Sequence, residues 1–187
     1  MKERLDKKSY IRGEMKMTVW KMNLNPYIAE KTKFPDKKYD PFCFCGLKRV
    51  IAIGWLYNGS WNSYDEYING ANKVYAGSSD FKKAFNAFNS LQFGDLVLLN
   101  DPTRDKYYVC RVLDDAPKAD KCEEFKTYGF SAYRNTTEFY EWCDKSEIHS
   151  LGFTKNQCSP TPTIEHICNT ELCEKICAFY KSKTQLV

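Results

Sequence analysis

Hydrophobic and polar residues alternate over 18–24, and the alternation stops before Pro26. A period of two places successive side chains on opposite faces of a sheet, so this pattern predicts a first strand over 18–24. The lysine- and proline-rich stretch 34–42 is predicted to be a loop. A nearly continuous apolar run then spans 48–57, and its length predicts a buried central strand.

The clearest helical pattern begins at Ser78 or Ser79, either of which can cap a helix N-terminus. Apolar residues then recur at the spacing of one helix face, namely Phe81, Ala84, Phe85, Phe88 and Leu91. This stripe predicts a helix whose apolar face belongs to the core. The preceding segment 61–75, which mixes aromatic and polar residues, predicts a short and irregular helix.

A β-hairpin is predicted directly after this helix. The turn at Gly94-Asp95 leads into the apolar strand 96–99, and residues 101–105 connect it to a second strand over 106–112. The acidic and polar residues 114–127 are predicted to form a loop.

The C-terminal part predicts one more strand, over 136–142, and a closing helix that Asn169 or Thr170 can cap. One side of that helix carries Leu172, Ile176, Phe179 and Tyr180. Strands thus come early, are interrupted by a strong helix, resume as a hairpin and end with a helix. This order predicts an α+β fold built on a strongly bent sheet or an open barrel.

Length and composition agree with one folded domain. The chain has 187 residues, of which 43% are hydrophobic and 28% charged, and this profile argues against disorder and against a coiled coil. No stretch approaches the roughly 20 apolar residues that span a bilayer, and residues 1–16 are charged without an apolar segment behind them. We therefore expect a cytoplasmic protein with no membrane partner.

The nine cysteines do not follow the spacing of a zinc site, because the sequence contains no Cys-x-x-Cys pair. The odd count and the absence of a secretory signal also argue against a disulfide framework. Cys168, Cys173 and Cys177 fit one face of a helix, where cysteine packs as a small hydrophobe. No metal and no cofactor is predicted.

Positive charge is concentrated in the first part of the chain. Residues 1–50 hold 13 Lys or Arg against 6 Asp or Glu, whereas residues 51–187 hold 15 against 18. A basic segment favours phosphate through counterion release, without any sequence preference. It is a candidate for contact with nucleic acid, although a solvated tail would have the same composition.

The usual enzyme signatures are absent from the sequence, including the phosphate-binding loop, the dinucleotide fingerprint and the Gly-x-Ser-x-Gly elbow. Neither of the two histidines, His149 and His166, lies beside an obvious nucleophile. A metal-dependent nuclease using Asp36, Glu124 and Lys126 is the remaining catalytic alternative. We expect any nuclease or NTPase activity to reside on another domain or partner.

Aromatic residues make up 16% of the chain, and several lie beside basic or amide residues. Flat aromatic side chains next to Lys and Asn are what recognition of an unstacked nucleobase needs. One such group runs from Trp20 to Asn23, and another comprises Trp55, Tyr57 and Trp61 at the end of the central strand. The alternative is that these tryptophans simply fill the core.

The order of these segments resembles the PUA-like superfamily. The likeness rests on the Trp20 strand, the Val50–Trp55 run, the Phe93–Leu99 turn and strand, and the strand that begins at Tyr107. The closest similarity is to its EVE and YTH branches and to the N-terminal recognition domains of McrB-type modification-dependent restriction systems. The resemblance covers about residues 17–113 and, through 141–142 and 163–167, extends to about residue 168.

The resemblance implies a curved sheet or pseudobarrel flanked by helices that holds one extruded or unpaired base in an aromatic pocket. Carried over to this sequence, the base-binding pocket comprises Trp20, Asn23, Trp55, Trp61 and Asp101. The implied phosphate-binding residues are Lys21, Lys48, Arg49 and Arg104. The implied organisation is a basic tail over 1–16, a recognition domain over 17–168 and a C-terminal helix over 169–187.

These observations lead to a hypothesis about function. The chain is expected to bind DNA and to recognise a modified base that is flipped into the aromatic pocket, as the sensor of a restriction or defence system. Its effector would be a nuclease or NTPase on a separate partner. The alternatives are an RNA reader of the YTH or EVE kind, the metal-dependent nuclease, and a domain that binds other proteins through exposed aromatic residues.

Overall fold

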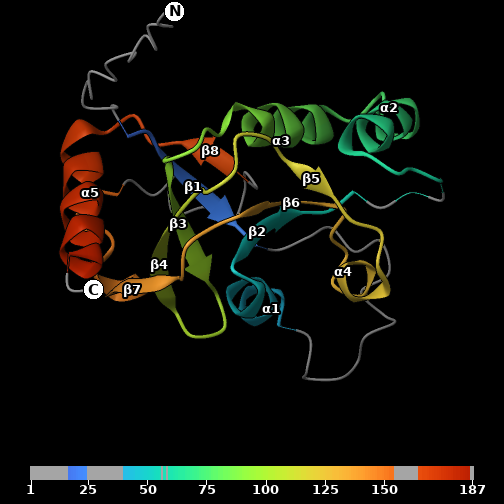
Figure 1. Cartoon of the computed structure of the whole chain (residues 1–187). Helices are drawn as coiled ribbons and strands as arrows, with labels where there is room; N and C mark the ends of the chain where they lie inside the picture. Colours follow the sequence, from blue (N-terminus) through green and yellow to red (C-terminus); the bar gives the residue numbers. More distant parts are fainter. Residues whose placement is uncertain (1–16, 25–39, 56, 58, 154–163, 186–187) are drawn as a thin grey trace, which may run out of the picture.

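A computed structural model describes residues 17–24, 40–55, 57, 59–153 and 164–185, and the structural findings concern these residues. They form an α+β fold with five α-helices and two β-sheets (Figure 1). The α+β class is therefore confirmed. The two sheets are not closed into a barrel in this part of the chain.

The larger sheet has five strands in the order β7-β4-β3-β1-β8. Only β1 and β3 run parallel to each other, and the other neighbours are antiparallel. The strands are β1 (Val19–Asn23), β3 (Leu96–Asp101), β4 (Lys106–Arg111), β7 (Tyr140–Asp144) and β8 (Ile164–His166). The predicted first strand and the predicted hairpin are both confirmed.

The smaller sheet has the order β2-β6-β5 and is antiparallel throughout. Its strands are β2 (Val50–Ile53), β5 (Lys118–Ala119) and β6 (Ala132–Asn135). An isolated bridge between Val112 and Thr136 connects the two sheets. The central strand is buried as predicted but shorter, and the strand predicted over 136–142 begins four residues later, as β7.

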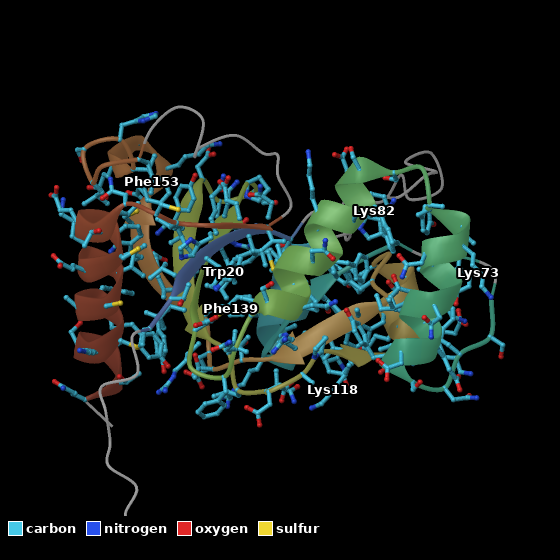
Figure 2. All side chains as sticks on the ribbon, turned by 90° about the horizontal axis from the view of Figure 1, so that it is seen from above. Trp20, Lys73, Lys82, Lys118, Phe139 and Phe153 are labelled. Carbon is cyan, nitrogen blue, oxygen red and sulfur yellow. The ribbon has the colours of Figure 1, made fainter. Side chains whose placement is uncertain are left out.

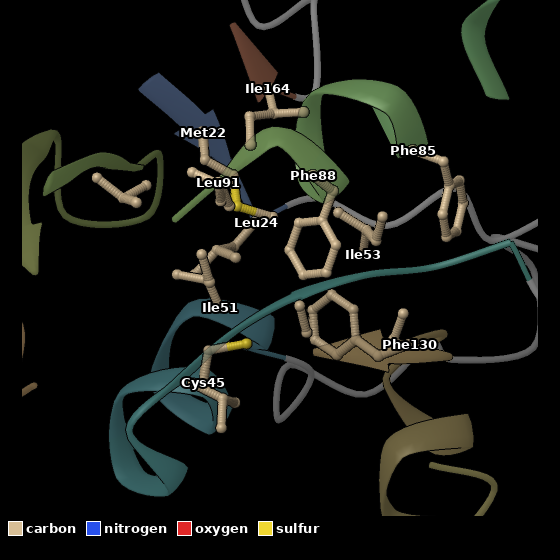
Figure 3. Packing of buried hydrophobic residues seen from close by; sticks show 14 of the residues in the cluster. Met22, Leu24, Cys45, Ile51, Ile53, Phe85, Phe88, Leu91, Phe130 and Ile164 are labelled. Carbon is tan, nitrogen blue, oxygen red and sulfur yellow. The ribbon is translucent and has the colours of Figure 1, made fainter. Parts of the chain in front are cut away.

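Alternating residues of β3 face two different cores. Val97 and Leu99 belong to a core between the two sheets, whereas Leu96 and Leu98 belong to a second core beneath α5. Both faces of this strand are therefore covered, which explains its continuous apolar sequence. Figure 3 shows the first core, where Phe88 and Phe130 are drawn on either side of β2.

Three helices close the first core. They are α1 (Pro41–Lys48), α2 (Tyr64–Val74) and α3 (Ser79–Ser90), and they bring several aromatic side chains between the sheets. A fourth short helix, α4 (Glu123–Thr127), lies within the segment 114–127 that was predicted to be a loop.

The predicted helix with the Phe81 stripe is confirmed as α3. Ser78 caps it by accepting a hydrogen bond from the Phe81 backbone N–H at 3.2 Å. All five residues of the predicted stripe are buried. The prediction of a loop up to residue 42 was wrong at its end, because Pro41 begins α1 and Asp40 caps that helix. Proline is well accommodated in the first helical turn.

The closing helix is also confirmed, as α5 (Thr170–Thr184) with Asn169 as its N-cap. Its buried face contributes three residues to the second core, namely Leu172, Ile176 and Tyr180. The same core contains Ile148, which directly follows a short 3₁₀ segment (Lys145–Glu147). Figure 2 shows α5 and α2 at opposite ends of the molecule, with Phe153 near α5 and Lys73 on α2. No helix within the described ranges is both long and apolar enough to cross a membrane.

Candidate functional site

Aromatic rings gather where the chain leaves β2 and enters α2 and α3. We call Trp55, Tyr57, Trp61 and Tyr67 the aromatic cluster. The ring of Tyr57 lies 5.1 Å from that of Trp61 and 5.9 Å from that of Tyr67, measured between ring centres. The ring of Trp61 lies 5.2 Å from that of Tyr67. These separations fall in the range in which aromatic pairs attract each other.

The cluster continues into the core through α3. Trp55 meets Phe81 edge-on, with ring centres 5.6 Å apart, and Tyr67 contacts Phe85 at 5.7 Å. Trp55 and Tyr57 are half-buried, whereas Trp61 and Tyr67 are buried. The aromatic cluster therefore has an inner part that belongs to the core and an outer part that reaches the surface.

A hydrogen-bond network holds the backbone of Trp55. The hydroxyl of Tyr67 donates to the Trp55 carbonyl at 3.3 Å, and the Trp55 backbone N–H donates to the Ser131 hydroxyl at 3.2 Å. The Ser131 hydroxyl in turn donates to the Tyr67 hydroxyl at 2.6 Å. Burial raises the pKa of Tyr67 well above its usual range, so this hydroxyl stays neutral. The network fixes the end of β2 against α2 and β6.

The indole nitrogen of Trp61 is buried without a hydrogen-bond acceptor among the described residues. A buried donor without a partner is costly, and in native proteins such groups often mark a site that a ligand or water completes. Tyr57 packs on the Trp61 ring and approaches two glycines closely. A Cβ atom added to Gly70 would lie 1.9 Å from the Tyr57 hydroxyl oxygen, and one added to Gly59 would lie 2.0 Å from its ring.

Trp20 and Asn23, the other candidates for the pocket, lie on β1 of the larger sheet. The Trp20 indole N–H donates to the Asp95 carboxylate at 2.9 Å, and its ring lies 5.3 Å from that of His166. Asn23 is buried. Ring contacts connect Trp55 to Trp61 through Phe81, Phe85 and Tyr67, and no ring contact between described residues joins Trp20 to this group.

Asp101 stabilises the β3–β4 hairpin. Its carboxylate is fully buried and accepts hydrogen bonds from the backbone N–H groups of Thr103 and Arg104, at 3.0 and 3.2 Å. It also accepts one from the Arg104 guanidinium at 2.7 Å. The oxygens that were predicted to accept from a base are thus already bonded within the turn.

Each of the four candidate phosphate-binding residues is paired with a carboxylate. Lys21 is buried beside Glu165, and the other three reach the surface around α1. Their partners are Glu124 for Lys48, Glu138 for Arg49, and both Asp101 and Asp40 for Arg104. Hydrogen bonds to the two aspartates raise the pKa of Arg104 further above its usual range. A phosphate at any of these cations would compete with a carboxylate of the chain itself.

The residues of the nuclease alternative are not brought together by the described structure. Glu124 pairs with Lys48, Lys126 pairs with Glu123, and Asp36 lies outside the described residues. Within the described segments, no group of three or more His, Cys, Asp or Glu residues has a geometry that could hold a metal ion.

Two of the three C-terminal cysteines lie on α5, namely Cys173 and Cys177, and both are half-buried against the second core. The expectation that Cys168 shares this helix face was wrong. Cys168 precedes the N-cap of α5 and is exposed, with its sulfur 3.4 Å from Nδ1 of His166.

Sequence reasoning missed Tyr67 and Ser131, which hold the aromatic cluster in place. A signal for the helix that carries Tyr67 was present, because Ser63 and Glu66 have the spacing of a capping box. The Ser63 hydroxyl accepts from the Glu66 backbone N–H at 3.2 Å, which starts α2 and orients its buried face. For Ser131, whose partners lie 64 or more residues away, the sequence offers no such signal.

Comparisons of the chain with protein-family models, with curated proteins and with solved structures found no match.

Proposed function

We propose that this protein is a nucleic-acid-binding reader that recognises a modified base of DNA by holding the flipped base in the aromatic cluster. The observation that carries the proposal is the buried Trp61 indole N–H, which has no acceptor among the described residues and lies beside stacked aromatic rings. A nucleobase offers both a flat face for stacking and ring or carbonyl acceptors for such a donor.

Tyr57 marks the place that the base would take. Its ring is nearly parallel to that of Tyr67, with an angle of 26° between the planes, and it also covers Trp61. Its hydroxyl makes one long hydrogen bond, 3.4 Å, to the Tyr67 carbonyl. Because this bond is weak and the side chain is half-buried, Tyr57 is the ring that an entering base would displace.

The fold proposed for this function is the PUA-like one, on the basis of the sequence resemblance and the α+β class. The effector that would act on the recognised DNA, a nuclease or an NTPase, is proposed to be a separate partner in a restriction or defence system. The reader itself is proposed to act by binding, not by catalysis, without a cofactor and in the cytoplasm.

The test is direct binding to short DNA duplexes that differ at one position only. That position carries plain, methylated or hydroxymethylated cytosine, or plain or methylated adenine, and binding is measured at about 50 and 200 mM salt. We expect one modified base to bind clearly more tightly than its plain counterpart. The Trp61→Phe variant should lose that preference, because phenylalanine cannot donate a hydrogen bond.

Trp142→Phe is the matched control, since Trp142 lies on β7 and packs against Phe153 in the second core. It should keep the preference of the unmodified chain. Equal binding of plain and modified duplexes would contradict the proposal. Tighter binding of RNA of the same sequence would instead favour the alternative reader of unpaired RNA bases.

A further inference from the structure

Arg111, at the end of β4, is half-buried and has no carboxylate within ion-pair distance among the described residues. The two exposed arginines of the described chain, Arg49 and Arg104, are both paired with carboxylates. Arg134 is fully buried and bonds to backbone carbonyls. Among the described residues, Arg111 therefore keeps a positive charge that no ion pair neutralises.

The guanidinium of Arg111 lies over the ring of Phe93, 5.6 Å from its centre. Phe93 is 45% exposed, which is unusual for so large an apolar side chain. Gly94 makes room for this arrangement, because a Cβ atom there would lie 3.3 Å from Nη2 of Arg111, and its φ of +95° suits glycine. The Nε atom of Arg111 is buried without a hydrogen-bond partner among the described residues, so the guanidinium would meet an anion such as phosphate through its Nη groups.

The neighbours of this pair include an exposed apolar residue and a basic one. Leu113 is exposed, and it follows Val112, whose carbonyl accepts a hydrogen bond from the Gly94 backbone N–H at 2.9 Å. Thr137 links Arg111 to α5, because its hydroxyl accepts hydrogen bonds from the Arg111 backbone N–H at 3.0 Å and from the Tyr180 hydroxyl at 3.4 Å. Lys181 follows on the exposed side of α5.

Strand β1 begins at the same end of the sheet. Arg111 is paired in register with Leu96, and the Leu96 backbone N–H donates to the Thr18 carbonyl at 2.9 Å. The sequence before Met17 holds six Lys or Arg against three Asp or Glu. Positive charge that is not neutralised locally, together with an exposed aromatic ring, is the chemistry that binds a phosphodiester chain and its bases.

We propose that Arg111 and Phe93 form a contact site for the nucleic-acid strand, in which Arg111 binds a backbone phosphate and Phe93 stacks against an unpaired base. This inference rests on the proposed function, since it adds a second point of contact to the same ligand. The site also differs from the four phosphate-binding residues predicted from the sequence, each of which has a carboxylate partner.

The experiment uses the whole chain and fluorescently labelled DNA duplexes with plain or modified bases, each with a single-stranded overhang, beside single strands of DNA and RNA with the same sequence, at several salt concentrations. Arg111→Gln should weaken binding of every sequence alike and should lower the slope of log affinity against log salt by about one. Phe93→Leu should weaken binding by about tenfold, since base stacking on an aromatic ring contributes about 1–3 kcal/mol. Lys82→Gln, on the exposed face of α3, is the control for the loss of one positive charge and should change affinity by less than about twofold.

The possible outcomes separate this inference from the proposed function. If the unmodified chain binds nucleic acid and both Arg111→Gln and Phe93→Leu bind as it does, the Arg111–Phe93 site is wrong while the reader proposal stands. If the unmodified chain binds neither DNA nor RNA at low salt, both proposals are wrong. The unfolding temperature of each variant is compared with that of the unmodified chain, to distinguish a loss of binding from a loss of folded protein.

Discussion

Lys21 and Glu165 face each other on the neighbouring strands β1 and β8, with Nζ of the lysine 3.3 Å from Oε1 of the glutamate. The lysine side chain is 1% exposed, so its charge is held inside the fold beside the Glu165 carboxylate at the edge of the sheet. Removing one partner of a buried pair weakens the compensation of the other charge, which costs more than loss of a surface pair.

We therefore expect Glu165→Gln to lower the free energy of unfolding by about 2–4 kcal/mol, measured by urea denaturation. Glu141→Gln is the matched control, because Glu141 also lies on a strand and pairs with Lys106 at the surface, where loss of a pair costs about 0–1 kcal/mol. The double variant Lys21→Met with Glu165→Leu should recover most of the loss. Equal effects of Glu165→Gln and Glu141→Gln would show that Lys21 is not stabilised by this pair.

Asp101 provides a second prediction about stability. Asp101→Ala removes the acceptor for two backbone N–H groups of the hairpin, so it should cost about 2–3 kcal/mol. Asp101→Asn keeps one oxygen acceptor and should cost about 1 kcal/mol. Asp105→Asn in the same hairpin should be nearly neutral, because the φ of +52° at this position suits asparagine. If Asp101→Asn changes the base preference without changing stability, then this residue reads a base after all.

The sequence predicted those helices and strands that are determined by residues close to one another in the chain. The Phe81 stripe of α3, the alternation of β1 and the cap of α5 each lie within a few neighbouring residues, and each is found in the structure. Helix α1 was missed because Pro41 and the lysines before it were read as a loop, although proline also starts helices. Strand β7 was placed too early because residues 136–139 connect strands of two different sheets.

The candidate site was predictable only in part, because its residues depend on partners that are distant in the chain. The tryptophans stand out by residue type, so Trp55 and Trp61 could be selected as candidates from the sequence. Their environment depends on partners far along the chain, such as Ser131, which lies 76 residues after Trp55. The same holds for charge: Lys21 pairs with a glutamate 144 residues away, and this partner determines whether the lysine is available to a phosphate.

A third prediction concerns alkaline pH. Burial raises the pKa of Cys143 from its ordinary value of 9.0 to about 12, with smaller contributions from Glu147 and Asp144. The thiol ionises near pH 9 in the unfolded chain but stays protonated in the folded one. Its contribution to stability is therefore complete below pH 9 and is lost as the pH rises from 9 to 12.

The slope that one such group adds is at most about 1.4 kcal/mol per pH unit. Urea denaturation at pH 8, 9 and 10 should show a steeper loss for the unmodified chain than for Cys143→Ala. Cys122→Ala is the control, because Cys122 is exposed, and it should leave the pH dependence unchanged. An identical pH dependence of all three proteins would contradict the assignment to Cys143.

The last prediction concerns the close contact between Gly70 and Tyr57, whose ring a bound base is proposed to displace. Alanine is normally about 1 kcal/mol more favourable than glycine within a helix such as α2. At Gly70, however, the added Cβ atom would lie 1.9 Å from the Tyr57 hydroxyl oxygen and 2.4 Å from its ring carbon Cζ. Gly70→Ala should therefore destabilise the protein, by about 1–3 kcal/mol, because Tyr57 must leave its contact with Trp61 and Tyr67.

A double-mutant cycle checks this reasoning, because the sign of the effect depends on Tyr57. In a Tyr57→Ala background the obstacle is gone, so Gly70→Ala should stabilise the protein by up to about 1 kcal/mol. If Gly70→Ala is stabilising in both backgrounds, Tyr57 does not occupy this position in solution. If the sign changes as expected, Gly70→Ala moves Tyr57 off Trp61 without altering either tryptophan, and base binding by that variant reports directly on whether Tyr57 occupies the base site.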